Sequence, residues 1–398
     1  MSQARALTGL RIWDGVSDRY LDGADAIRIE GDRIAAIGPA REVAAGAEVQ
    51  SFDGAAALPG LCDAHVHMTL DATKRPPADQ LEIPRAVAER AMAERALAML
   101  RSGITTARDL GGGAWLELDL RDRIARGEIP GPRLLCAGQP VTSAGGHCHF
   151  WGGEASGEQE IRSTVRRQVE RGADWIKVMA TGGVLTKGTS TGEAQFEVSE
   201  LSALVDEAAR HGRGVAAHCH GTPGIRNAVA ARVQTIEHCS WVGPDGFGSG
   251  LDTEVVRAMA SHGIWASPTV NAGWRRFLES GERGARFRER MRECYRAMRQ
   301  AGVRFVASTD AGIPGVEHHR LSEALRTFAR YAELTPSEAL RSATSHSAGV
   351  LGLTDVTGSL RPGLAADLLI VAGDPLSDLA ALEVRAAVFA RGRRIDLE

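Results

Sequence analysis

Cysteine is scarce in this sequence and does not occur in closely spaced pairs. The six cysteines are scattered along 398 residues, with no C-x-x-C spacing. This excludes the disulfide framework of small secreted proteins and a thioredoxin-like redox motif, and it predicts free thiols. Cys148 and Cys219 each stand between two histidines, which makes them candidates for soft metal ligands. The favoured interpretation is that each is a small buried residue beside a ligand.

Long apolar runs and an excess of positive charge are absent too. No run of about 18 apolar residues is present, and the first residues, MSQARALTGLRIWDG, lack the apolar core of a signal peptide. The formal net charge of −3 offers no positive field to attract nucleic acid or an anionic membrane. We therefore predict a cytoplasmic protein without nucleic-acid or membrane partners. We also expect it to form a homo-oligomer and to act on a small-molecule substrate.

From residue 59 to about 350, the sequence repeats a short apolar run, a polar loop and a longer amphipathic stretch. This alternation predicts an α/β protein in which helices join parallel strands. Eight successive units favour a closed (β/α)8 barrel over an open sheet. The expected strands cover residues 57–67, 103–109, 133–141, 173–180, 214–220, 233–239, 264–270 and 303–310.

Residues 86–103 and 199–212 have the clearest helical patterns. We expect the second of these helices to have Ser199 as its N-cap and Gly212 as its C-cap. The stretch 287–300, FRERMRECYRAMRQ, is rich in arginine and glutamate, which predicts a solvent-exposed helix face.

The two ends of the chain contain short alternating strands and glycine turns, a pattern typical of antiparallel β structure. Neither end alone has enough strands to bury one face of a sheet. We therefore expect residues 1–58 and 354–398 to form one small β-sandwich beside a barrel of residues 59–353.

The clearest chemical signal is Asp63-Ala64-His65-Val66-His67, at the end of the first expected barrel strand. Residues two apart on a strand project from the same face. Two imidazoles at that spacing can bind one metal ion from one side. Taken alone, the H-x-H spacing is equally compatible with exposed loop histidines.

Other potential ligands fall on further expected strands. His218 ends the fifth strand, His238 the sixth and Asp310 the eighth. Lys177 lies inside the apolar fourth strand, where a charged amine is costly unless it is paired or neutralised. Because barrel enzymes keep their sites at the carboxyl ends of the strands, this arrangement predicts a metal site there.

H-x-H on the first strand, Lys on the fourth, His on the fifth and sixth, and Asp on the eighth resemble the amidohydrolase superfamily over the whole chain. The segments SAGGH (143–147), IKVMATGG (176–183), AHCHG (217–221) and TIEH (235–238) are similar to one branch of it. That branch contains Xaa-Pro dipeptidases and Xaa-Arg/Lys carboxypeptidases and is related to imidazolonepropionases. The resemblance implies a metal-dependent hydrolase acting on carbon–nitrogen bonds.

The resemblance also implies a role for each ligand position. His65, His67 and Asp310 would bind one divalent ion, expected to be zinc, and His218 and His238 would bind a second. Lys177, carboxylated on its side-chain nitrogen by carbon dioxide, would bridge the two ions. A hydroxide bridging the metals would then attack the amide carbonyl of a dipeptide or N-acyl amino acid. Asp310 would act as general base and afterwards as general acid.

Two further histidines are candidates for the substrate-binding residues. His147 follows a Gly-Gly turn, and we expect it to bind and activate the substrate carbonyl or carboxylate, with an inert loop histidine as the alternative. His220 shares a strand face with His218 but lies further toward the barrel mouth, so substrate contact is favoured over metal ligation. The other histidines are interpreted as mainly structural, with substrate contact as a second possibility for His318 or His319.

Two other functions stay open. One is a deaminase or imidazolonepropionase-like ring hydrolase with a single metal, against which Lys177 argues because such a site needs no bridging carbamate. The other is a catalytically inactive binding or assembly protein on the same fold. Every expected ligand position is filled, which favours an enzyme.

Overall fold

Parallel strands joined by helices make up the middle of the chain, as the alternating pattern predicts. The computed structural model describes residues 4–398. In it, β7, β8 and β9 pair in parallel, as do β10, β11, β12 and β13. These strands are Leu61–Val66, Ile104–Asp109, Arg133–Cys136, Trp175–Met179, Gly214–Gly221, Thr235–Val242 and Trp265–Ser267. Most are buried throughout, as expected for parallel strands covered on both faces.

Single bridges connect these two groups of strands. Val141 pairs with Val178, Ala266 with Phe305, and Val66 with Ala311, all in the parallel sense. They link the segment after β9 to β10, β13 to the segment 303–311, and that segment to β7. The segment 303–311 therefore lies beside both β13 and β7.

The eighth expected strand, residues 303–310, is not a regular strand, which corrects the sequence prediction. The segment still lies between β13 and β7, because Val306 N donates to Ala266 O and Asp310 N donates to His65 O. At Thr309 the backbone N–H and the hydroxyl both donate to the buried carboxylate of Asp63. The side chain of Asp63 thus takes the place of a backbone hydrogen-bond acceptor. The hydrophobic periodicity of the sequence does not reveal this substitution.

The strand predicted over 133–141 is also shorter than expected and ends at Cys136. Gly138 has a φ of +72°, which lies outside the strand region. Pro140 has no N–H to donate to a neighbouring strand. These two residues interrupt the strand before Val141 resumes pairing with β10.

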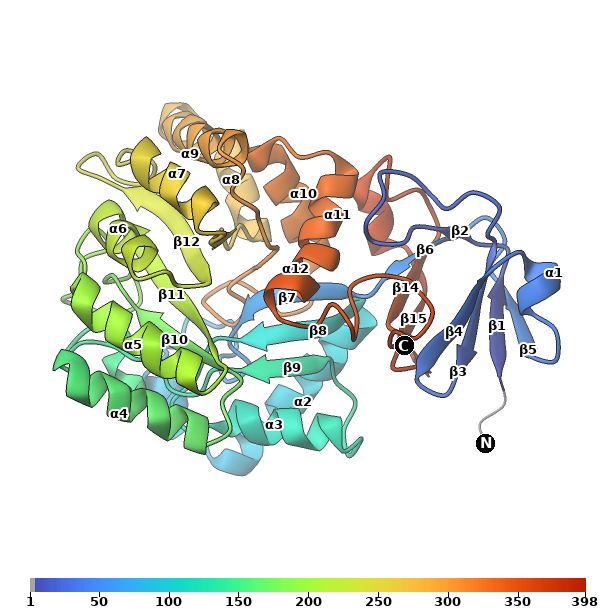
Figure 1. Ribbon diagram of the computed structural model, residues 1–398, viewed down its shortest axis with the longest axis horizontal. Helices are drawn as coiled ribbons and strands as arrows, with labels where there is room; N and C mark the ends of the chain where they lie inside the picture. The colour runs from blue at the N-terminus through green and yellow to red at the C-terminus, as the bar shows by residue number, and fades with distance from the viewer. Residues whose placement is uncertain (1–3) are drawn as a thin grey trace.

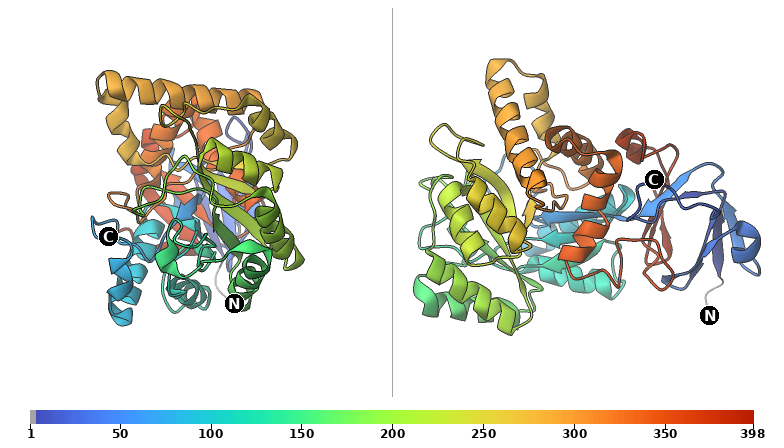
Figure 2. Two further views of the ribbon diagram at one scale, coloured as in Figure 1. Left: turned by 90° about the vertical axis from the view of Figure 1, so that its left-hand side faces the viewer. Right: turned by 45° about the horizontal axis from the view of Figure 1, so that its top comes forward.

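Helices lie around the strands in the left view of Figure 2. They are α2 Arg85–Arg101, α3 Leu116–Ala125, α4 Gly157–Glu170, α5 Val198–Arg210, α6 Thr222–Ala230, α7 Thr253–Ser261, α8 Arg275–Glu279, α9 Glu282–Gln300, α10 Leu321–Ala332, α11 Pro336–Ser342 and α12 Ser345–Val350. Within residues 4–398, no helix has the length and apolar character needed to cross a bilayer.

Two details of the helices differ from the sequence predictions. The N-cap of α5 is Glu197 and not Ser199, because the side chain of Glu200 accepts from the backbone N–H of Glu197 and begins the helix earlier. The helix α9 is not simply a solvated helix. Met291, Cys294, Tyr295 and Met298 are completely buried on one of its faces.

The two chain ends form two small sheets that lie together on the right of Figure 1. One sheet has the order β4-β3-β1-β5 and the other β16-β15-β14-β6-β2. The strands are β1 Arg5–Thr8, β2 Arg11–Ile12, β3 Ala26–Glu30, β4 Arg33–Gly38, β5 Glu48–Ser51, β6 Ala56–Pro59, β14 Leu368–Val371, β15 Arg385–Ala390 and β16 Arg393–Ile395. Leu7, Ile27, Leu368 and Phe389 from both sheets share one buried apolar cluster.

The pairing in these sheets is not antiparallel throughout, contrary to the sequence prediction. β1 pairs with β5 and β2 with β6 in the parallel sense. A parallel partner needs a long crossover to bring the chain back in the same direction. The β3–β4 hairpin and α1, Ala40–Val43, supply that crossover between β1 and β5.

Candidate metal centre

All of the site residues predicted from the sequence lie on the wall of one cavity of about 1750 Å³. β7 supplies His65 and leads into His67, β10 supplies Lys177, β11 supplies His218 and His220, and β12 supplies His238. His147 and Asp310 come from the segments that follow β9 and precede α10. They come together because the carboxyl ends of parallel strands meet at one edge of the sheet.

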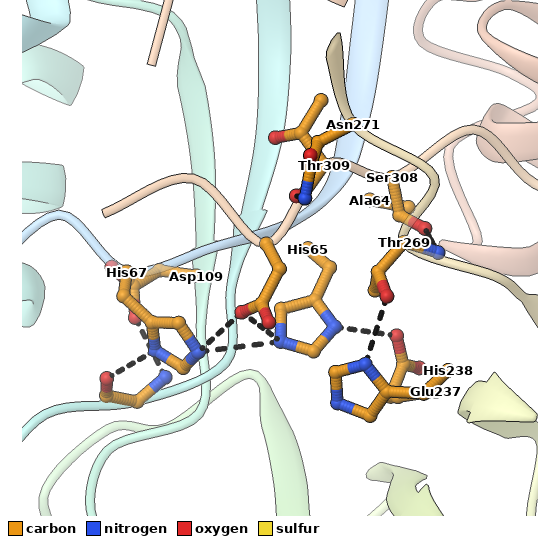
Figure 3. Close-up of polar contacts among 12 residues, drawn as sticks. Ala64, His65, His67, Asp109, Glu237, His238, Thr269, Asn271, Ser308 and Thr309 are labelled. Atoms are coloured by element: carbon orange, nitrogen blue, oxygen red, sulfur yellow. Dashed lines mark hydrogen bonds and ion pairs between the residues drawn. The ribbon is translucent and has the colours of Figure 1, made fainter. Parts of the chain in front are cut away.

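His65, His67 and Asp310 lie close together at this site, and Figure 3 labels the two histidines. The Nε2 atoms of the two histidines are 3.2 Å apart, and Oδ1 of Asp310 is 3.3 Å from each of them. Burial acts to raise the pKa of Asp310, but its surroundings, with His65 and His67 foremost, lower the pKa overall. The carboxylate is therefore held in its ionised form beside two ring nitrogens.

The hydrogen bonds on the far side of each ring show that these nitrogens are suited to a cation. Nδ1 of His67 is 2.8 Å from the carbonyl oxygen of Gly111, which can only accept, so Nδ1 carries the proton. Nδ1 of His65 is likewise 2.9 Å from Oε2 of Glu237. Burial lowers the pKa of His65 to about 4, so that ring is neutral near pH 7. With both Nδ1 atoms engaged on the far side of the rings, the two Nε2 atoms and the Asp310 carboxylate face one another, an arrangement suited to a metal ion.

A second group joins His218, His220 and His238, whose potential ligand atoms lie within 4.8 Å of one another. Nδ1 of His238 is 2.8 Å from the Thr269 hydroxyl, and Nε2 of His218 is 3.2 Å from the Gly182 carbonyl. The second contact assigns the proton of His218 to Nε2 and leaves its Nδ1 for a ligand. Burial lowers the pKa values of both His218 and His238.

His220 lies closer to the potential ligands than its sequence interpretation implies. Its ring is stacked on that of His238, with the centroids 4.5 Å apart, and Nδ1 is 3.0 Å from the Ser240 hydroxyl. Its position fits a third ligand beside His218 and His238 as well as a substrate contact.

Two of the predicted ligands have an unusual backbone. His238 and Asp310 have φ values of +64° and +61°, in the left-handed region that non-glycine residues rarely adopt. Such conformations cost roughly 1–3 kcal/mol each and persist where the surrounding structure enforces them. His238 lies inside β12 and Asp310 at the end of the 303–310 segment, and both side chains reach the cavity.

Lys177 is almost completely buried, at 1% exposure, in the middle of β10. Burial lowers its pKa, although Glu237 and Asp310 oppose this effect. None of the hydrogen bonds found among residues 4–398 involves its Nζ. An amine in this state is uncharged more often than a surface lysine, and it faces the same cavity as the histidines.

Glu237 and Arg108 support the site and were not assigned a role from the sequence. Both are fully buried, and the guanidinium of Arg108 donates to Oε1 of Glu237 over 2.8 Å while Oε2 contacts His65. Arg108 also donates to the carbonyl of Ala64 and lies 4.5 Å from the ring of Trp175. The sequence could have indicated both residues, because each is a charged residue inside a buried strand. The same kind of signal pointed to Lys177.

His147 is buried and lines the cavity, with its ring 4.7 Å from that of His218. Its Nδ1 has no hydrogen-bond partner among residues 4–398. Gly183 allows this position, because a Cβ there would collide with the ring of His147.

The remaining histidines and the cysteines contribute little to the cavity wall. His149 and His319 do not line the cavity, and Nε2 of His318 contacts the carbonyl oxygen of His67. The six cysteines are all buried and free, and only Cys148 reaches the cavity wall.

The fold and this convergence of imidazoles and a carboxylate define an α/β protein with a candidate metal centre at the ends of its parallel strands. Comparison with known families identifies it further: residues 56–395 match the amidohydrolase family, and the chain belongs to that family.

Several proteins are similar to it over most of their length. Ochratoxinase from Aspergillus niger is 29% identical over 375 residues, covering 83% of this chain and 73% of the relative. Imidazolonepropionase from Chloroflexus aggregans is 25% identical over 393 residues, covering 89% and 85%. The crystal structure of a Xaa-Pro dipeptidase with bound methionine superposes with a TM-score of 0.83 at 27% identity, covering 98% of this chain and 99% of that chain.

Proposed function

We propose that this protein is a binuclear metal-dependent hydrolase that cleaves the amide C–N bond of a small substrate of the dipeptide or N-acyl amino acid type. The observation that carries the proposal is the convergence of His65, His67 and Asp310, with the opposite ring nitrogens already engaged. The similarity to an ochratoxinase and to a Xaa-Pro dipeptidase supports hydrolysis as the reaction.

His65, His67 and Asp310 would hold one ion, and His218 and His238 the other. Lys177 would bridge them after its neutral amine adds to carbon dioxide and loses a proton, which forms a carbamate. When bound, divalent ions lower the pKa of water and polarise a carbonyl oxygen. The buried position of Lys177 supports the carbamate, because this change turns a poorly solvated amine into an anionic ligand.

Side chains of the protein would then transfer the proton and bind the substrate. The ionised carboxylate of Asp310 accepts a proton from the attacking water and returns it to the leaving nitrogen as the C–N bond breaks. His147, whose Nδ1 has no partner among residues 4–398, hydrogen-bonds the substrate carbonyl or carboxylate. His220 contacts the substrate beside it. The products are a carboxylic acid and an amine.

We also infer that the parallel strands and the segment 303–310 close into a (β/α)8 barrel of residues 59–353. Residues 1–58 and 354–398 would form the flanking β-sandwich. The bridges at Val66, Val141 and Ala266 support closure. The shared apolar cluster of the two terminal sheets supports the sandwich.

The test is to load metal-free protein with zinc, count the bound ions per chain, and follow amine release from dipeptides and N-acyl amino acids. We expect two ions per chain and hydrolysis that disappears on chelation. One ion per chain with turnover would support the mononuclear alternative. Two bound ions without hydrolysis of any substrate would support the binding-protein alternative.

A further inference from the structure

The cavity is larger than a dipeptide needs. Its volume of about 1750 Å³ exceeds the roughly 300–1,000 Å³ typical of pockets for drug-sized ligands. The inner end carries the histidines, and the outer part lies under α8 and α9. These helices are the orange pair projecting upward in the right view of Figure 2. The outer part is therefore available to a portion of the substrate that does not react.

Aromatic side chains are concentrated in this outer part. The chain has only 9 Phe, 3 Tyr and 7 Trp, yet the cavity wall includes Trp151, Phe247, Trp274, Phe277 and Phe287. Phe247 follows β12, Trp274 immediately precedes α8, and Phe277 and Phe287 belong to α8 and α9. Apart from Trp151, these side chains are only partly buried. Large aromatic side chains are usually buried in folded proteins.

Four of these residues form a continuous aromatic wall that begins beside the histidines, and we define it as Phe247, Trp274, Phe277 and Phe287. The ring of Phe247 is 5.7 Å from that of His220 and 6.0 Å from that of Phe287. Phe287 in turn lies 5.0 Å from Trp274 and 4.7 Å from Phe277. All of these separations are within the range of favourable aromatic pairs.

We propose that the aromatic wall is a binding subsite for a bulky aromatic group of the substrate, with the scissile amide placed among the histidines. This assignment rests on the proposed function and narrows it to amides that carry a bicyclic or similarly large aromatic ring. Stacking on the partly exposed rings of Phe287 and Trp274 removes apolar surface of both partners from water. A purely aliphatic dipeptide would leave the apolar surface of these rings exposed to water.

The test combines binding and turnover. The probes are 2-naphthoate for binding, and N-(2-naphthoyl)glycine and glycine 2-naphthylamide for turnover, with N-acetylglycine and glycine methylamide as non-aromatic counterparts. Phe287→Leu and Trp274→Leu keep an apolar side chain but remove the ring. Phe277→Leu tests the outer edge, where the only aromatic side chain within pairing distance among residues 4–398 is Phe287. Phe52→Leu is the matched control, because Phe52 is a partly buried phenylalanine of the terminal sheets.

We expect 2-naphthoate to bind the wild-type protein, and each wall variant to weaken that binding about three- to tenfold. In the wall variants, kcat/KM for a naphthyl amide should fall by a similar factor through KM, and by more than kcat/KM for its small counterpart. Phe52→Leu should change neither value. Naphthoate that does not bind, or binds all variants alike, would overturn the aromatic subsite. Weakened naphthoate binding in a protein that hydrolyses no amide would retain the subsite and reject the proposed function.

Discussion

The carboxylate of Glu237 lies 2.9 Å from Nδ1 of His65, and both side chains are buried at 0% and 1% exposure. The contact orients the ring and keeps the proton on Nδ1, so Nε2 faces the proposed metal. Glu237→Gln should therefore weaken metal binding about 10–100-fold, a typical effect of losing such a partner. The measurement is competition for zinc against a chromophoric chelator.

Arg108 provides the control for this experiment, because Glu237→Gln also leaves its buried guanidinium without a counter-charge. Removing one partner of a buried ion pair costs about 3–5 kcal/mol of stability. Arg108→Met removes the cation but keeps the contact between Glu237 and His65. If the two variants lose the same amount of metal affinity, the effect is a general destabilisation and not the orientation of His65.

Asp310→Asn should leave metal binding largely in place and remove most of the turnover. The amide can still offer an oxygen to a cation, but it cannot carry the proton from water to the leaving nitrogen. The expected loss in kcat is about 10²–10⁴-fold. The measurement is steady-state kinetics on protein whose metal content has been determined. A loss smaller than about tenfold would mean that another group transfers the proton.

Lys177→Met should reduce the metal content below two ions per chain, because the substitution removes the bridging ligand but preserves an apolar side chain of similar length. The carbamate itself can be observed by ¹³C NMR after incubation with labelled bicarbonate. The chain has three lysines, and Lys74 and Lys187 are exposed. Lys187→Met should therefore keep the carbamate signal, while Lys177→Met should abolish it. A signal unaffected by Lys177→Met would contradict the assignment.

His147→Ala should keep two ions per chain and lower kcat/KM about ten- to a hundredfold. This corresponds to the roughly 1.5–3 kcal/mol of a hydrogen bond to a charged group. The same result is expected for His220→Ala if His220 contacts the substrate. Loss of an ion in that variant would instead make His220 a ligand, as its proximity to His218 and His238 also allows. Full activity of His147→Ala would return His147 to the role of a loop histidine.

The buried Glu117 predicts a pH dependence of stability. It is fully buried, neither of its carboxylate oxygens has a partner among residues 4–398, and burial next to Asp109 raises its pKa to about 8. A carboxyl group whose pKa is higher in the folded state stabilises the protein fully below the unfolded pKa, about 4.3. That contribution is lost as the pH rises through about 8.

Glu117→Gln removes this titration and keeps the shape of the side chain. The free energy of unfolding of the variant should exceed that of the wild type by on the order of 1 kcal/mol or more at pH 8.5, with little difference at pH 4.5. Urea denaturation of metal-free protein at both values measures it. Glu158→Gln, at an exposed position at the start of α4, is the control. Parallel pH profiles of Glu117→Gln and the wild type would show that Glu117 is ionised in the folded state.

The residues of the candidate site could be predicted from the sequence because their positions follow from strand geometry. The spacing of His65 and His67 puts both on one face of a strand, and the ends of parallel strands meet at one edge. The irregular segment 303–310 could not be predicted, because it depends on where the side chain of Asp63 finds a partner in space. The aromatic wall was missed for a related reason. Phe247 and Phe287 come together only through the packing of a loop against α9.

The pairing of β6 with β14 has a consequence for how the protein is made. Leu58 pairs with Leu369, so the partner of β6 follows it in the sequence by about 310 residues. At ribosomal rates of about 5–20 residues per second, that partner arrives on the order of tens of seconds later. During that interval one edge of β6 has no strand to pair with. The strand that carries His65, β7, follows β6 directly and begins at Leu61. The sheet that contains β6 therefore cannot be completed until β14 has been synthesised, and the growing chain carries an open sheet edge until then.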